Sequence, residues 1–190
     1  MIPQVYLKLA IKATILPLFL GLIFPCTVWA QEPIDSGYVE QKTMWEQVHA
    51  PQAWDITTGS KSVVVASIDT GMDTWHDDLR DNAWINPYEI PGNGIDDDMN
   101  GYIDDVNGWN FVEENNDVRT SVFGEKDLAA AVDHGTILAG LVGAAANNGI
   151  GGVGVNWSVR IMPLRALDSA GNGSFAHVID AVNYAVDNGA

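Results

Sequence analysis

Cysteine is almost absent from this chain. The single cysteine among its 190 residues is Cys26, and none follows residue 30. The part of the chain after residue 30 therefore cannot form disulfides, which commonly stabilise small proteins in an oxidising exterior. If that part works outside the cell, bound metal ions are the remaining kind of cross-link.

Basic side chains are also scarce. The chain has 9 Lys and Arg against 25 Asp and Glu, which gives a formal net charge of −16. Such a charge repels phosphate backbones and anionic lipid headgroups, so we expect neither nucleic acid nor a membrane surface as a partner. The 47% hydrophobic and 18% charged content fits a globular protein and excludes collagenous, low-complexity and coiled-coil classes.

The first thirty residues have the composition of a secretory signal peptide. They contain no Asp or Glu, carry Lys8 and Lys12 near the front, and continue in an apolar run over residues 13–24. This run is too short to span a bilayer as a helix, and the small residue Ala30 suits a cleavage site. We predict a signal peptide over residues 1–30 and export to the extracellular space or periplasm, with no membrane contact after cleavage. An uncleaved anchor is the alternative, but no basic stop-transfer cluster follows the run.

The rest of the chain has the pattern of an α/β protein. Residues 31–60 are polar with scattered tryptophans and predict an arm with short helical turns. The elements expected after the arm are a buried strand at Ser62–Ile68, loops over residues 69–124, a helix at Asp133–Ala146, a buried strand at Val159–Leu164, and a helix capped by Ser174 and ending near Asn188. This order predicts a parallel β-sheet with helices on both faces. The chain ends where the next strand should begin, so we expect a fragment truncated before the later strands.

Two residues occupy positions at which active sites assemble. Asp69 directly follows the first buried strand, and the carboxyl ends of parallel strands carry the sites of such sheets. His134 opens the first long helix and is followed by Gly135, which leaves room for a substrate beside the imidazole. Taken singly, Asp69 could be a loop cap and His134 an ordinary surface or core residue.

Several separated motifs resemble the subtilisin-like serine peptidase family. They are Ile68-Asp69-Thr70-Gly71, His76 with Asp78-Leu79, Gly92 to Asp98 (GNGIDDD), His134-Gly135-Thr136 with Ala139-Gly140, and Ile161 to Arg165 (IMPLR). They stand in the order that the family has, from about Tyr38 to Ala190. The resemblance implies that residues 31–60 are the N-terminal arm of the catalytic domain and that residues 61–190 are the N-terminal part of a subtilisin-like peptidase domain.

The resemblance also implies a catalytic triad in the chain order Asp, His, Ser. Asp69 would orient His134, which would act as general base and then as general acid on a polypeptide substrate. No Gly-Thr-Ser-Met-Ala nucleophile motif occurs in the 190 residues, and the oxyanion-hole asparagine of the family is also missing. We therefore expect a secreted serine endopeptidase of which this chain alone is inactive. The alternative is a catalytically inert calcium-binding interaction module on the same scaffold.

An acidic loop has the spacing of a calcium site. The residues at positions 1, 3, 5, 7 and 9 of the calcium-loop pattern are Asp96, Asp98, Asn100, Tyr102 and Asp104. Position 12 is Asn107 instead of the usual Glu, which predicts a weak site suited to millimolar extracellular calcium. A cluster of turn residues without an ion is the alternative, although so many like charges would then repel one another.

The resemblance implies two further sites. A second structural calcium ion would be bound by Asp78 and by Asn148, which lies in the loop over residues 146–152. The segment Gly171-Asn172-Gly173 resembles the edge segment with which the family pairs an extended substrate by strand addition.

Overall fold

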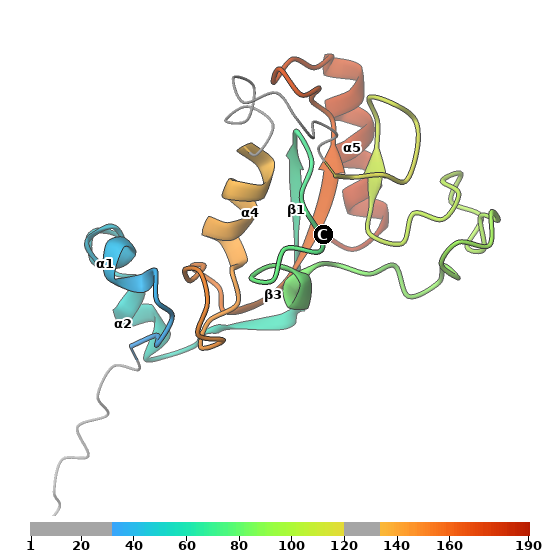
Figure 1. The fold of residues 1–190 in the computed structure, drawn as a ribbon. Helices are drawn as coiled ribbons and strands as arrows, with labels where there is room; N and C mark the ends of the chain where they lie inside the picture. The colour runs from blue at the N-terminus through green and yellow to red at the C-terminus, as the bar shows by residue number, and fades with distance from the viewer. Residues whose placement is uncertain (1–31, 120–133) are drawn as a thin grey trace, which may run out of the picture.

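The computed structural model describes residues 32–119 and 134–190, and within these ranges the chain forms a sheet of three parallel strands (Figure 1). The strands are β1 (Gly59–Asp69), β2 (Trp109–Asn110) and β3 (Ser158–Arg165), in the order β1-β3-β2. Both predicted buried strands are therefore present. β2 was not predicted, because its two residues make no apolar run.

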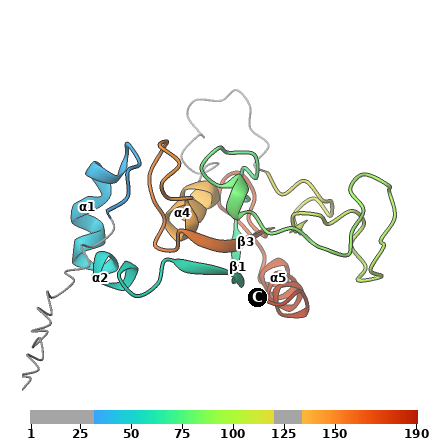
Figure 2. The same ribbon diagram turned by 90° about the horizontal axis from the view of Figure 1, so that it is seen from below.

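Helices cover both faces of the sheet, as the sequence predicts. Figure 2 shows α4 (His134–Gly143) and α5 (Phe175–Asp187) on opposite sides of β1 and β3. Alternate side chains of β3 face opposite sides of the sheet. Ile161 packs in one core cluster with Ala139 of α4, and Met162 packs in another with Ala181 of α5. The continuous apolar run of β3 is thus explained by burial on both faces.

The ends of α5 agree with the predicted caps. The Ser174 Oγ accepts a hydrogen bond from the His177 N–H at 3.1 Å, and Asn188 is the C-cap. Gly189 follows with a φ of 86°, the left-handed conformation that commonly ends a helix. The start predicted for α4, Asp133, lies outside the described residues.

The arm forms two short helices, α1 (Tyr38–Gln47) and α2 (Ala50–Trp54). Trp54 connects them to the body of the domain. Its indole N–H donates to the carbonyl oxygen of Val155 at 2.9 Å, and its ring lies 5.2 Å from that of Trp157. This aromatic cluster holds the arm in place together with hydrogen bonds such as that from the Gly37 N–H to the Gly151 carbonyl oxygen.

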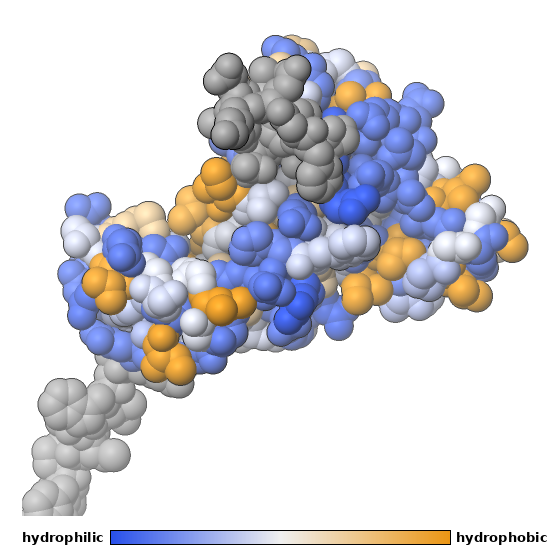
Figure 3. All heavy atoms as spheres, in the orientation of Figure 1, coloured by the Kyte–Doolittle hydropathy of each residue, from blue (hydrophilic) through white to orange (hydrophobic). Residues whose placement is uncertain are grey.

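Long loops connect β1 to η1 (Arg80–Asn82) and η1 to β2. Figure 1 shows the segment between η1 and β2 extending away from the sheet. The face drawn in Figure 3 is largely hydrophilic with scattered apolar residues, consistent with the high acidic content of the chain. Over the described ranges no helix is long and apolar enough to cross a membrane, and the predicted signal peptide lies outside them.

Candidate active site

The structure brings Asp69 and His134 together. The Nδ1 of His134 lies 2.8 Å from Oδ1 and 3.0 Å from Oδ2 of Asp69. The Asp69 side chain is 10% exposed and that of His134 is 54% exposed, so a buried carboxylate supports an accessible imidazole. Because the carboxylate is an acceptor, the proton of the neutral imidazole lies on Nδ1, which leaves Nε2 free to accept a proton.

Two glycines allow the helix start to approach the end of the strand so closely. A Cβ at Gly135 would fall well inside contact distance of the Gly71 carbonyl oxygen. Gly71 itself has a φ of 112°, which L side chains rarely adopt. The Gly135 N–H donates to Thr70 Oγ1 at 3.2 Å, and the Asp73 N–H donates to Thr136 Oγ1 at 3.0 Å. The residues that follow Asp69 and His134 in sequence thus fasten α4 to the end of β1.

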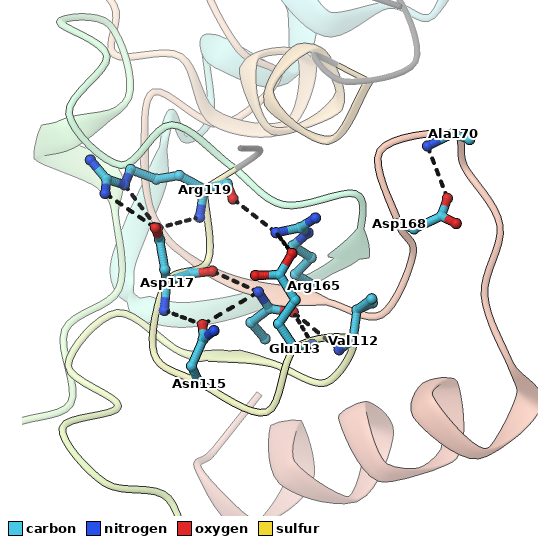
Figure 4. Close-up of polar contacts among 9 residues, drawn as sticks. Val112, Glu113, Asn115, Asp117, Arg119, Arg165, Asp168 and Ala170 are labelled. Carbon is cyan, nitrogen blue, oxygen red and sulfur yellow. Dashed lines mark hydrogen bonds and ion pairs between the residues drawn. The ribbon is translucent and has the colours of Figure 1, made fainter. Parts of the chain in front are cut away.

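A buried cation organises the adjoining loop at the carboxyl end of β3. Arg165 is only 3% exposed, and its Nη1 lies 3.2 Å from Glu113 Oε1 and donates to the carbonyl oxygen of Arg119 at 3.4 Å (Figure 4). Arg165 is also the register partner of Asp69. The Arg165 contacts therefore hold residues 111–119 against the same sheet edge as the Asp69–His134 pair.

The predicted substrate segment is an exposed turn after β3. Gly173 bridges Leu167 in antiparallel fashion, and the N–H and C=O groups of residues 168–173 form a tight loop. The Asp168 carboxylate shapes this loop, because its Oδ1 accepts hydrogen bonds from the N–H group of Ala170 at 2.9 Å (Figure 4) and from that of Asn172 at 2.8 Å. These bonds hold the pKa of Asp168 below its usual value. The sequence analysis did not single out Asp168, although an Asp three residues before a glycine is a common turn signal.

The acidic loop brings together a different set of carboxylates from the predicted one. Oxygen atoms of Glu89, Asp96 and Asp98 lie within 4.8 Å of one another. The carboxylate of Asp104 instead accepts hydrogen bonds from the N–H groups of Asn93 at 3.1 Å and Gly94 at 2.8 Å. Glu89 was missed because it stands outside the loop pattern.

Asn100 and Tyr102 make internal contacts in this loop. The Asn100 N–H donates to both Asp96 and Asp98, at 3.0 and 3.1 Å, and the Asn100 Oδ1 accepts from the Tyr102 N–H at 2.8 Å. The Tyr102 ring packs 5.0 Å from the ring of Tyr184 on α5. The loop is thus tied to the domain core as well as closed on itself.

The second predicted metal site contains an additional buried acid. Asp78 and Asn148 are in contact, with the Asn148 Nδ2 donating to Asp78 Oδ1 at 2.8 Å. Burial raises the pKa of Asp78. The buried carboxylate of Asp35 faces the same loop and accepts from the N–H groups of Asn147, Asn148 and Gly149 at 2.6, 2.9 and 3.0 Å. No motif surrounds Asp35 in the sequence, so only the fold shows its position.

A carboxylate at the end of a parallel strand, bonded to an accessible imidazole at a helix start, is the arrangement of a hydrolase general base. The chain belongs to the subtilase family: the family model described as "Subtilase family" matches residues 60–190. The resemblance inferred from the sequence and the α/β fold are both confirmed.

Curated relatives extend the match. The chain is 32% identical over 161 residues to the thermophilic serine proteinase of Bacillus sp. (strain AK1), covering 85% of this chain and 32% of the relative. It is 30% identical over 158 residues to thermitase of Thermoactinomyces vulgaris, covering 83% and 45% respectively. It is 35% identical over 134 residues to subtilisin-like protease 1 of Plasmodium berghei, covering 70% and 21%.

A solved structure shows the same fold. A protease of Pseudoalteromonas arctica PAMC 21717 superposes with a TM-score of 0.54 at 29% identity, over 79% of this chain and 43% of that one. The chain therefore spans less than half the length of each of these relatives.

Proposed function

We propose that the chain provides the aspartate and histidine of a serine endopeptidase that hydrolyses peptide bonds in polypeptides. The observation that carries this proposal is the hydrogen bond of 2.8 Å between Asp69 and His134, at the carboxyl end of β1. The family supplies the reaction class. The serine of the triad is assigned to the additional length that the relatives have, because the Gly-Thr-Ser motif is missing from these 190 residues.

In this mechanism His134 first accepts a proton and then donates it. Its Nε2 accepts the proton of the serine hydroxyl as the serine oxygen bonds to the peptide carbonyl carbon, and then donates that proton to the amine as the C–N bond breaks. In the second half of the reaction Nε2 takes a proton from water as the water oxygen bonds to the acyl carbon. It then returns a proton to the serine oxygen as the ester C–O bond breaks, which releases the acid and restores the serine hydroxyl. Asp69 remains ionised throughout, keeps the Nδ1 proton in place and stabilises the imidazolium.

We assign substrate binding to Gly171, Asn172 and Gly173. Gly171 and Gly173 are exposed and carry no side chain that would keep an extended peptide from lying along this segment as an added strand. Asp168 preserves the shape of this segment through its bonds to the N–H groups of Ala170 and Asn172. Main-chain pairing of this kind accepts many substrate sequences.

We also propose that calcium stabilises the protein. Carboxylate and carbonyl oxygens are the ligands that calcium prefers. The buried Oε2 of Glu89 has no hydrogen-bond partner, and it belongs to the group with Asp96 and Asp98, which supports an ion bound there. A second ion would be held by Asp78 and Asn148, and the buried carboxylate of Asp35 faces the same loop over residues 146–152. A bound ion would supply charge that holds these loops in place and would take no part in the chemistry.

Export completes the proposal. The signal-peptide pattern over residues 1–30 supports secretion outside the cell or into the periplasm. A further relative, 28% identical over 158 residues, is named a halolysin-like extracellular serine protease of Natrialba magadii.

The decisive experiment replaces His134 and Asp69 in the full-length protein. In subtilisin, a member of the same family, loss of the histidine lowers kcat about 10⁶-fold and loss of the aspartate about 10⁴-fold. We expect both variants to have a much lower kcat on a peptide substrate, with His134→Ala less active than Asp69→Asn. A serine-directed fluorophosphonate should label only the active protein strongly. His177→Ala, a histidine outside this site, serves as the control. Unchanged activity in His134→Ala would refute the proposal, and no activity in the wild-type protein would favour the inert binding module.

The 190-residue chain alone should hydrolyse no peptide. It has neither the nucleophile nor the oxyanion-hole asparagine of the family. Peptidase activity that a serine-directed inhibitor abolishes, measured on the purified chain, would contradict this expectation.

A further inference from the structure

Trp75 is an unusually exposed aromatic residue. It is 73% exposed, whereas the other tryptophans within residues 32–119 and 134–190 are buried or half-buried. A tryptophan offers a large apolar surface, and leaving it in water forgoes the free energy that burial would gain. Tryptophan is also the residue most enriched among the few that dominate protein interfaces.

The surrounding residues hold Trp75 in place. The backbone N–H of Trp75 donates to Oδ1 of Asp73 at 3.0 Å, and the backbone N–H of Asp73 donates to Thr136 Oγ1. The guanidinium carbon of Arg119 lies 4.8 Å from the centre of the Trp75 ring, a cation–π contact. Two contacts from separate parts of the chain thus fix the backbone and one ring face, and a side chain held this way loses little entropy when a partner binds.

Arg119 is itself clamped. Its Nε and Nη2 donate to the two carboxylate oxygens of Asp117, at 2.9 and 3.3 Å, as Figure 4 shows. This fork-shaped pairing gives the guanidinium a defined plane. Arg119 therefore holds one face of the Trp75 ring, and the other face is left to a partner.

Two hollows meet at Trp75. One, of about 400 Å³, is also lined by Thr74, Pro91, Asn107, Asn116 and Asp117. The other, of about 500 Å³, is also lined by His76, Asp77, Asp78, Ile150 and Gly151. Because Trp75 lines both, a chain lying across the indole could place a side chain in each hollow.

The charge of this surface selects the partner. Asp73, Asp77 and Asp117 belong to the two segments that build the surface, and the chain as a whole carries a net charge of −16. Arg80 and Arg119 pair with Asp77 and Asp117, so the excess negative charge comes from Asp73 and from Asp78 and Asp104, which line the hollows and have no lysine or arginine partner among the described residues. A cationic partner is favoured, because lysine and arginine combine a charge for the acids with an apolar stem and a cation–π contact for the indole.

We propose that Trp75, with Arg119 behind it, forms a docking surface for a lysine- or arginine-bearing stretch of a polypeptide substrate, outside the Asp69–His134 site. The identity of the partner as a substrate rests on the proposed function. The surface itself rests on the exposure, clamping, hollows and charge of the residues that build it. Binding at this surface would favour long cationic polypeptides over short peptides that reach only the Asp69–His134 site.

Direct binding tests the surface without any catalysis. The full-length protein carrying His134→Ala is titrated with a synthetic peptide of alternating lysine and alanine, and with its glutamate counterpart. We expect Trp75→Ala in this background to weaken binding of the lysine peptide about tenfold, and Trp75→Phe to weaken it less. Tyr88→Ala, at a residue equally 73% exposed, is the matched control and should leave binding unchanged. Equal affinity with and without Trp75, or equal binding of the glutamate peptide, would overturn the proposal.

Cleavage tests the link to the substrate. The ratio of kcat/KM for a long lysine-rich polypeptide to that for a short chromogenic peptide is measured in the otherwise wild-type protein. We expect Trp75→Ala to lower this ratio about tenfold through KM, and Tyr88→Ala to leave it unchanged. An unchanged ratio would show that the surface does not serve substrates. If the wild-type protein cleaves nothing, the proposed function fails, while the binding titration still decides whether the surface exists.

Discussion

The hydroxyl of Tyr184 donates a hydrogen bond of 2.5 Å to Oδ2 of Asp105 and so joins α5 to the acidic loop. Both residues are buried, and Asp105 also accepts from the side-chain amides of Asn86 and Asn100, each at 2.9 Å. The same two amides donate to Asp98, at 3.0 and 3.2 Å. Burial raises the pKa of both Asp105 and Tyr184. A fully buried carboxylate is tolerated here because three donors surround it.

Replacing Tyr184 with Phe should destabilise the full-length protein by about 1–3 kcal/mol, since Asp105 then loses one donor and remains buried. The measurement is urea unfolding followed by circular dichroism. Tyr88→Phe removes an exposed hydroxyl instead and should change the free energy of unfolding little. Equal stability of the two variants would mean that the Tyr184 hydroxyl contributes nothing to holding the loop.

Gly135→Ala and Gly140→Ala should have opposite effects, although both lie on α4. A Cβ at Gly135 would clash with the backbone of Gly71, whereas a Cβ at Gly140 meets nothing within 4 Å. We expect Gly135→Ala to cost about 3 kcal/mol or more by overpacking and to reduce activity by separating His134 from Asp69. Gly140→Ala should raise stability by about 0.5–1 kcal/mol, the helix-propensity gain. Thermal melting of both variants gives the comparison, and a Gly135→Ala protein as stable as wild type would contradict the close approach.

Much of the fold could be predicted because its signals are local. β1, β3 and α5 each have an apolar run or a helical spacing with its own cap, as Ser174 illustrates for α5. β2 has no such signal: its two residues form a strand only because they pair with Leu164 and Arg165 of β3, far along the chain. Pairing of this kind depends on the folded structure and leaves no pattern in the short segment itself.

The candidate site also contains some residues that local sequence patterns identify and others that only the fold brings together. Asp69 and His134 stand in motifs and at element ends, so their types and positions already indicated that they would meet. Glu89 and Asp35 reach their clusters through the fold, and neither stands in a recognisable pattern. Asp104 shows the converse. It matches the calcium-loop spacing, but the spacing did not fix where its carboxylate points, and the N–H groups of residues 93 and 94 donate to it.

Chelation should lower the melting temperature of the full-length protein, because ions that bind only the native state stabilise it by mass action. Glu89→Gln should reduce the difference in melting temperature between calcium and chelator, since Glu89 contributes a buried oxygen to the group with Asp96 and Asp98. Glu46→Gln, at an exposed acid on α1, is the control and should leave that difference intact. Superimposable melting curves with calcium and with chelator would count against both proposed ions.

Asp168 should act on substrate binding through the segment that it shapes. Its carboxylate holds the N–H groups of Ala170 and Asn172, so Asp168→Ala frees the loop that presents residues 171–173. Because a flexible edge must be ordered before a peptide can pair with it, we expect KM to rise about three- to tenfold with a smaller change in kcat. Asp168→Asn keeps one acceptor oxygen and should recover part of the loss, whereas Asp180→Ala, at an exposed acid on α5, should behave as wild type.

Steady-state kinetics on a peptide long enough to span the edge segment give these values. A fall in kcat at constant KM would instead place the effect of Asp168 on the Asp69–His134 pair, since the strand that leads to Asp168 is paired with Asp69 through Arg165.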